Sequence, residues 1–327
     1  MSLSALLTFL FGLVVITVGA ETLLKGASKI ASLLNIRPIV IGLTVVSIGT
    51  SLPELAVGLT AISEGASDIA VGNIAGTNII NILFILGLSA AIRPLPLQLK
   101  SIQKDVYTMI IAAVLLFILS LDKNLSTLDG LLLVALGIVY LYLVVRISKN
   151  EPIVVQVEFQ QEYKPVTPSE KSDIKVWTWN FMLLFCGIVA TIYGAEKLIE
   201  GSVAIAQHFG MSDVIIGLTI VAIGTSAPEL ATTIVATFRN DRDVAIGNLL
   251  GSSIINIFII LGITSIFTPN GINVSEDILW FDLPLAALVA LICYPVFKSD
   301  QMVSRREGIF FVGLYILYVS YLLVLRV

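Results

Sequence analysis

The chain contains one segment twice. Residues 42–89 begin GLTVVSIGTSLPEL and end GNIAGTNIINILFILGLS, and residues 217–264 begin GLTIVAIGTSAPEL and end GNLLGSSIINIFIILGIT. The copies are 175 residues apart without a gap, and 25 of the 48 aligned positions are identical. The identities include Glu, Pro and Asn within apolar runs, so the likeness is more than shared hydrophobicity. We therefore expect a fold of two related halves.

The composition indicates a membrane protein. Hydrophobic residues make up 57% of the chain and charged residues 13%, against about 25% charged in soluble proteins. Apolar stretches of the length that spans a bilayer recur throughout, and lipid leaves them only the helix as a backbone structure. We expect an all-α membrane protein with ten transmembrane helices, surrounded by the lipid bilayer, without a nucleic-acid partner and monomeric. The expected helices are residues 3–24, 38–62, 69–91, 105–121, 127–148, 177–199, 213–238, 243–267, 279–297 and 308–326.

The first apolar stretch belongs to the repeat. It lacks the positive segment that begins a signal peptide. Residues 18–21 (VGAE) match residues 193–196 (YGAE) at the same spacing of 175, and Gly26 matches Gly201. We therefore expect the stretch to be retained as the first helix.

The distribution of charge predicts the topology. Five helices per half make the second half enter the membrane from the opposite side, so the halves are inverted repeats. With the N-terminus outside, 16 of the 19 Lys and Arg residues fall in inner loops, and the exceptions are Lys123, Lys197 and Arg326. The positive-inside rule therefore predicts that both termini lie outside. The expected parts are a first five-helix repeat (1–148), a cytoplasmic linker (149–176) and a second, inverted repeat (177–327).

A proline interrupts the second helix of each half. Proline lacks the amide hydrogen that a helix needs, and its ring crowds the preceding turn, so carbonyl groups there are freed. We expect helices 2 and 7 to be discontinuous near the bilayer midplane, an arrangement typical of the binding sites of secondary transporters. The helix-breaking residues are Pro53, Pro228, Gly49 and Gly224.

Each interrupted helix also carries a carboxylate. Glu54 follows Thr50 by four residues and Glu229 follows Thr225 by four, so each pair shares a helix face. A carboxylate at the bilayer centre costs at least ~2.5–3.5 kcal/mol, and no Lys or Arg is near in sequence. These residues must be protonated or bind a cation. Carboxylate, hydroxyl and carbonyl oxygens suit Ca²⁺, Na⁺ or Mg²⁺.

The helix after each break adds neutral polar groups. Asn73, Thr77 and Asn81 recur as Asn248, Ser252 and Asn256, at spacings of four that keep each set within an arc of about 80°. These groups are either ion ligands or hydrogen-bonding contacts between helices, and both interpretations stay open for Asn73, Asn248, Thr77 and Ser252. The glycines expected to permit close helix packing are Gly72, Gly76, Gly247 and Gly251.

The motif pair GTSLPE…GN…GTNIIN and GTSAPE…GN…GSSIIN resembles the two α-repeats of the cation/calcium exchanger superfamily. The resemblance covers essentially the whole chain and is to a compact prokaryotic member of the sodium/calcium exchanger type. It implies that Glu54 and Glu229 coordinate Ca²⁺ and Na⁺ alternately. It also implies that the first and sixth helices, 3–24 and 177–199, are the mobile pair.

The resemblance implies a fuller ligand set as well. The implied ligands are the carbonyls of Thr50 and Thr225 for Ca²⁺, the carbonyls of Ser47 and Ala222 for Na⁺, the hydroxyls of Ser51, Ser226, Thr77 and Ser252 at flanking Na⁺ positions, and Asn81 and Asn256 at the centre. Some microbial relatives carry Asp at the position of Asn256, which leaves the choice between Na⁺ and H⁺ open.

The function that these features predict is a secondary antiporter in the cell membrane that exchanges Ca²⁺ for Na⁺ by alternating access. A Ca²⁺/H⁺ antiporter of the same fold is the alternative. The inverted repeats argue against a cation channel. No nucleophile–base pair is near the carboxylates, so we expect neither an enzyme nor a cofactor other than the transported ions. The two cysteines, Cys186 and Cys293, are expected as buried apolar residues.

Overall fold

The computed structural model describes residues 3–34, 36, 38–65, 67–96, 99–149, 170, 173–209, 222–298 and 302–325. Within these residues, nine helices are long and apolar enough to cross a membrane. A tenth was expected at residues 213–238. It is described from Ala222 onward, as α13 (Ala222–Thr225) and α14 (Ala227–Arg239), and its first part lies outside the described residues.

The two halves contain matching elements. The first comprises α1 (Leu3–Leu34), α2 (Pro38–Ile41), the π-helical η1 (Gly42–Val46), α3 (Ser47–Thr50), α4 (Leu52–Ser63), α5 (Asp68–Ile79), the π-helical η2 (Ile80–Leu86), α6 (Gly87–Ile92), α7 (Leu99–Leu119) and α8 (Thr127–Lys149). The second comprises α11 (Ile174–His208), α13, α14, α15 (Arg242–Ile255), the π-helical η4 (Asn256–Leu261), α16 (Gly262–Phe267), the π-helical η5 (Ile278–Asp282), α17 (Leu283–Lys298) and α18 (Arg305–Leu325).

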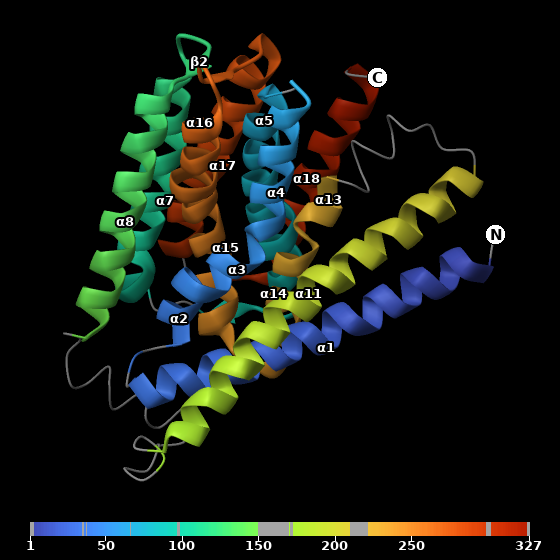
Figure 1. Cartoon of the computed structure of the whole chain (residues 1–327), viewed down its shortest axis with the longest axis vertical. Helices are drawn as coiled ribbons and strands as arrows, with labels where there is room; N and C mark the ends of the chain where they lie inside the picture. Colours follow the sequence, from blue (N-terminus) through green and yellow to red (C-terminus); the bar gives the residue numbers. More distant parts are fainter. Residues whose placement is uncertain are drawn as a thin grey trace.

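The continuous helices α5–η2–α6 and α15–η4–α16 are the most deeply buried spans. Their apolar side chains form a large part of one core, to which α7, α8, α17 and α18 also contribute (Figure 1). The glutamates of both proline motifs, Glu54 and Glu229, are buried in this bundle.

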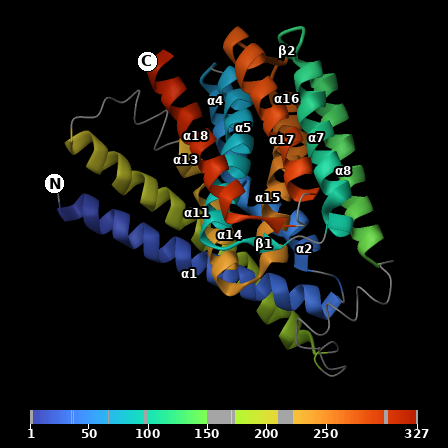
Figure 2. The same ribbon diagram turned by 180° about the vertical axis from the view of Figure 1, so that it is seen from behind.

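Helices α1 and α11 lie side by side and cross the bundle at a steep tilt, as Figures 1 and 2 show from opposite sides. Glycines at intervals of seven residues line their contact, so they return to one helix face. A Cβ at Gly19 would lie 2.6 Å from the Thr191 amide nitrogen, and one at Gly194 would lie 2.7 Å from Ile16 Cα. The backbones therefore touch. The six glycines of this seam are Gly12, Gly19 and Gly26 on α1, and Gly187, Gly194 and Gly201 on α11.

Both helices are longer than expected. Helix α1 has 32 residues and α11 has 35, where the sequence predicted 3–24 and 177–199. At 1.5 Å per residue, 32 residues extend about 48 Å, more than the ~30 Å hydrocarbon core. The tilt accommodates this excess.

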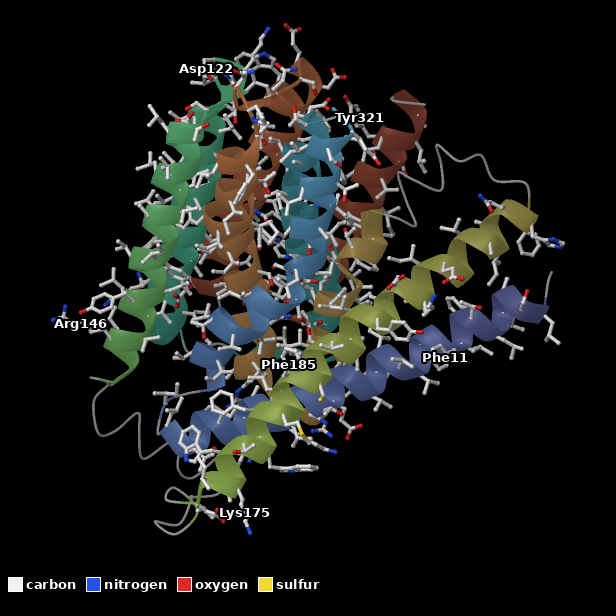
Figure 3. All side chains as sticks on the ribbon, in the orientation of Figure 1. Phe11, Asp122, Arg146, Lys175, Phe185 and Tyr321 are labelled. Atoms are coloured by element: carbon white, nitrogen blue, oxygen red, sulfur yellow. The ribbon has the colours of Figure 1, made fainter. Side chains whose placement is uncertain are left out.

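The outer faces of the α1–α11 pair are apolar. Phe11 and Phe185 point away from the seam (Figure 3). The expectation that Cys186 is buried was wrong. This residue precedes the seam glycine Gly187 but lies on the exposed face of α11, whereas Cys293 is buried, and both are free thiols.

Two short antiparallel strand pairs depart from the all-helical expectation. β1 (Leu95–Pro96) pairs with β4 (Met302–Val303), and β2 (Asn124–Leu125) pairs with β3 (Ile272–Asn273). They lie outside the apolar spans and each joins one half to the other. The fold is otherwise an all-α membrane protein.

Candidate functional site

Both proline motifs break their helices at the serine before the proline. Ser51 separates α3 from α4 with φ −85° and ψ 5°, and Ser226 separates α13 from α14 with φ −86° and ψ 8°. Each proline stands in the first turn of the new helix, where its missing amide hydrogen costs nothing. Glu54 and Glu229 lie in the same first turns. Each carboxylate therefore sits at the positive end of a helix dipole, inside the bundle.

The two carboxyl groups are buried and near each other. Glu54 is 1% exposed and Glu229 is 0% exposed, and their charges interact. Among the described residues, no Lys or Arg forms an ion pair with either. Two like charges without a compensating side chain require protons or a cation, because burial in a low-dielectric interior penalises them.

Hydrogen bonds link the motif of the first half to α15 of the second. The Thr50 hydroxyl donates to Asn248 Oδ1 at 3.3 Å and lies 3.4 Å from Ser252 Oγ. Ser252 donates to Glu229 Oε1 at 3.4 Å. Asn248 Nδ2 in turn donates to Thr232 Oγ1 at 2.8 Å. This network holds the amide of Asn248 in place, so its role includes helix contact.

Many other polar atoms around the carboxylates have no hydrogen-bond partner among the described residues. An unsatisfied buried polar group costs about 1–3 kcal/mol. A cluster of such groups therefore indicates a binding site for a polar or charged ligand. Carboxylate, hydroxyl and amide oxygens form the hard donor set that Ca²⁺ and Na⁺ prefer. The unpartnered groups among the expected ligands are both oxygens of Glu54, Oε2 of Glu229, the hydroxyls of Ser51, Ser226 and Thr77, and the side-chain amides of Asn81 and Asn256.

Among the described residues, the acidic groups of the site are Glu54 and Glu229. The described residues include no cluster of three or more His, Cys, Asp or Glu side chains arranged to hold a metal. Its remaining donors are therefore neutral oxygens. Asn81 lies within η2 and Asn256 begins η4, and π-helical turns are frequent at functional sites.

The remaining predicted residues lie on α3, α5 and α13. The Ser47 hydroxyl donates to the Gly42 carbonyl and lies 3.3 Å from the Asn248 carbonyl. Ala222 begins α13. The Thr225 side chain is buried at the end of α13, and Asn73 lies in α5 with an unpartnered Nδ2.

Helix α15 crosses α2 and η1 with almost no space between backbones. A Cβ at Gly247 would lie 2.6 Å from the Ile39 carbonyl oxygen, and one at Gly251 would lie 2.7 Å from Leu43 Cα. In the first half the packing differs. A Cβ at Gly72 would meet only the Ile278 side chain, at 3.1 Å, and one at Gly76 would have no described heavy atom within 4 Å.

The glycines before the two breaks face α11. A Cβ at Gly49 would lie 2.6 Å from Ile188 Cδ1, and one at Gly224 would lie 2.6 Å from Ile199 Cδ1. Ile188 and Ile199 of α11 therefore contact the two helix breaks. These contacts connect the α1–α11 pair directly to the site.

Sequence reasoning missed two further buried acids. Asp105 is 7% exposed and accepts a hydrogen bond from the Tyr140 hydroxyl at 3.1 Å, and Asp282 is 4% exposed and lies 3.3 Å from the Tyr318 hydroxyl. Both lie near the first turn of a membrane span. In a sequence, a charged residue at that place indicates the boundary of the helix and does not indicate burial. They join neighbouring helices, one pair in each half.

One end of α1 is tied to α14 and to the residues beyond it. Glu21 pairs with Arg239 and with Lys25, the latter at 3.2 Å. Ser28 donates to Asp241 at 2.7 Å. Lys29 pairs with Glu170 of the segment before α11 at 2.9 Å. The Glu21 side chain is 42% exposed, and the sequence did not suggest its partner on α14.

Comparisons with known proteins show the family of this chain. The family model for sodium/calcium exchanger proteins matches residues 4–146 and 179–324. CaxA of Alkalimonas amylolytica is 36% identical over 309 residues, 94% of each chain. A sodium/calcium exchanger of Methanosarcina acetivorans is 32% identical over 98% of this chain and 97% of its own. The solved structure of a sodium/calcium exchanger from Methanococcus jannaschii matches with a TM-score of 0.81 and 30% identity over 97% of both chains. The chain belongs to the sodium/calcium exchanger protein family.

Proposed function

We propose that this protein is a secondary antiporter that exchanges Ca²⁺ for Na⁺ across the cell membrane. The observation that carries the proposal is the cluster of unpartnered oxygens around Glu54 and Glu229. With both carboxylates ionised, the site carries about −2, which one Ca²⁺ or two monovalent ions balance. The names of the relatives from Methanosarcina acetivorans and Methanococcus jannaschii, both sodium/calcium exchangers, support the same ion pair.

Each ligand has a role in this proposal. Glu54 and Glu229 bind Ca²⁺ together with the carbonyls of Thr50 and Thr225, and the same carboxylates bind Na⁺ when Ca²⁺ has left. The flanking Na⁺ ligands are the carbonyls of Ser47 and Ala222 and the hydroxyls of Ser51, Ser226, Thr77 and Ser252, with Asn81 and Asn256 between them.

Alternating access follows from the two inverted repeats, 1–148 and 177–327, joined by the linker 149–176. The α1–α11 pair is the element proposed to move, because its glycine seam keeps the two helices together and its isoleucines contact both breaks. We place both termini outside. In support, Arg146 and Lys175 lie toward the end of the molecule opposite Asp122 (Figure 3).

The test is ⁴⁵Ca²⁺ uptake by purified protein in proteoliposomes, with Na⁺ and H⁺ gradients imposed separately at clamped voltage. Outward-directed Na⁺ at fixed pH should drive uptake. Uptake without any counter-ion gradient would indicate a channel, and no flux under any gradient would contradict transport.

Exchange of Ca²⁺ for H⁺ is the second candidate. It is favoured by the presence of Asn, rather than a third acidic residue, at positions 81 and 256, because two glutamates that each take one proton balance one Ca²⁺. Uptake driven by a pH gradient and indifferent to Na⁺ would select this candidate.

A further inference from the structure

Five buried hydroxyl groups have no hydrogen-bond partner among the described residues. Three of them, Ser51, Thr77 and Ser226, belong to the proposed ion ligands. The other two are Ser89 and Thr233, each 0% exposed. Neither was predicted from the sequence, and neither belongs to the ligand set above.

The absence of a partner is unusual for these residue types in this fold. Serine and threonine within helices commonly donate to the carbonyl four residues earlier, and several buried ones here do so. Thr237 donates to the Thr233 carbonyl at 2.8 Å, and Thr264 donates to the Ile260 carbonyl at 2.8 Å. Ser89 and Thr233 make no such bond, and neither do the proposed ligands Ser51 and Thr77.

The repeat relates these two hydroxyls to a contact that is seen in the other half of the molecule. Thr233 is the counterpart of Gly58, and Ser89 is the counterpart of Thr264, each at the spacing of 175. A Cβ at Gly58 would lie 3.0 Å from Thr264 Oγ1. The equivalent crossing in the other half brings α14 against α6, so the side chain of Thr233 fills the position that is bare at Gly58.

Thr233 also lies one helical turn from the ion site. Thr233 follows Glu229 by four residues on α14, so both project from one helix face. The Oε2 atom of Glu229 has no partner among the described residues. Farther along the same chain direction comes Asp241, which contacts Ser28 near the end of α1. Thr233 and Ser89 thus lie between the central site and the linker side of the molecule.

We propose that Thr233 and Ser89, together with Oε2 of Glu229, form an accessory Na⁺ site on the linker side of the central site. One carboxylate and two neutral hydroxyls match a monovalent cation better than Ca²⁺, whose affinity depends on the number of charged ligands. This inference rests on the proposed Na⁺ coupling. The other side lacks the site, because Gly58 has no side chain and the Thr264 hydroxyl is bonded within its own helix. Na⁺ affinity should therefore depend on the membrane face.

The experiment compares Thr233→Val, Thr233→Ser and Ser89→Ala with wild type in right-side-out and inverted membrane vesicles. It measures the Na⁺ and Ca²⁺ concentrations that give half-maximal exchange at each face. Val matches Thr in shape but lacks the hydroxyl, whereas Ser keeps it. Thr237→Val is the matched control, because that hydroxyl on the next turn is bonded within its own helix.

Thr233→Val and Ser89→Ala should each raise the half-maximal Na⁺ concentration at the linker face about tenfold, the loss expected for one ligand to a charge. The value at the opposite face and the values for Ca²⁺ should stay within about twofold of wild type, as should Thr233→Ser and Thr237→Val. An unchanged Na⁺ dependence at the linker face, or an equal rise at both faces, overturns the accessory site while Na⁺ coupling stands. If Ca²⁺ exchange by the wild type does not depend on Na⁺, both the accessory site and the proposed Na⁺ coupling are wrong.

Discussion

The two ends of the α1–α11 pair are related by the repeat but differ in their contacts. At the linker side, α1 packs along α14, and Glu21 pairs with Arg239. The equivalent positions at the other end are Glu196 on α11 and Glu64 after α4, two like charges. There Lys197 pairs with Glu200 of its own helix at 2.6 Å, and α11 has no contact with α4 comparable to that of α1 with α14.

The difference shows which parts of an inverted repeat are free to diverge. In the proposed alternating-access mechanism, the central motifs act in both the inward-open and the outward-open state. Both copies therefore retain the same Glu, Pro and Asn. A contact at one end of the molecule forms in only one of these two states, so the other repeat need not carry the same residues. In this structure the Glu21–Arg239 pair is a contact of this kind, between α1 and the end of α14.

The largest effect is expected where the copies are equivalent. Glu54→Gln and Glu229→Gln should each lower Ca²⁺ exchange by at least about 100-fold, because each removes half of the charge that balances a dehydrated divalent ion. Proteoliposome flux measures this, with size-exclusion chromatography as the control for folding. Near-normal exchange in either variant would show that the site is elsewhere.

The glycine seam should be the next most sensitive region. Gly194→Leu forces a side chain into the backbone of Ile16 and should lower the thermal unfolding midpoint in detergent by roughly 5 °C. Gly313→Leu is the matched control, because a Cβ at Gly313 would have no described heavy atom within 4 Å. Equal midpoints for the two variants would contradict close contact between α1 and α11.

A smaller effect is expected at the ion pair that distinguishes the two ends. Arg239→Ala should shift the balance toward the state open at the linker side by up to about fivefold, since a half-exposed pair contributes at most about 1 kcal/mol. The readout is the labelling rate of Thr237→Cys, in a background with Cys186 and Cys293 replaced, by an impermeant thiol reagent on the linker side. Lys197→Ala removes a pair within one helix and should leave this rate unchanged. A faster labelling rate in both variants would show that the difference between the two ends does not come from these two ion pairs.

The smallest effect should come from the exposed pair near the β2–β3 strands. A hydrogen bond and ion pair with Lys123, at 2.5 Å, lower the pKa of Glu276. A lowered folded-state pKa adds stability above the unfolded-state pKa, and this stability is lost as the pH falls through the folded-state pKa. Lys123→Ala should therefore lower the unfolding midpoint slightly at pH 7 and not at all at the acid end of a pH series. A difference from wild type that persists there would contradict this cause.

The sequence alone determined the repeat, the expected spans, the two broken helices and the two central glutamates. It could do so because lipid penalises charge and broken backbone strongly. A Glu or a Pro within an apolar span therefore stands out without knowledge of its neighbours. The inverted arrangement followed from an odd number of helices per half and from the positions of Lys and Arg.

Only the tertiary structure decided which neutral groups are hydrogen-bonded and which are unpartnered. A hydroxyl in a helix can donate to its own backbone anywhere along the span, so Thr233 and Thr237 look alike in the sequence, yet only Thr233 is unpartnered. The partner of Gly194 and the length of α1 likewise depend on how two tilted helices cross. Those contacts join residues far apart in the chain, and their geometry is set by packing rather than by local periodicity.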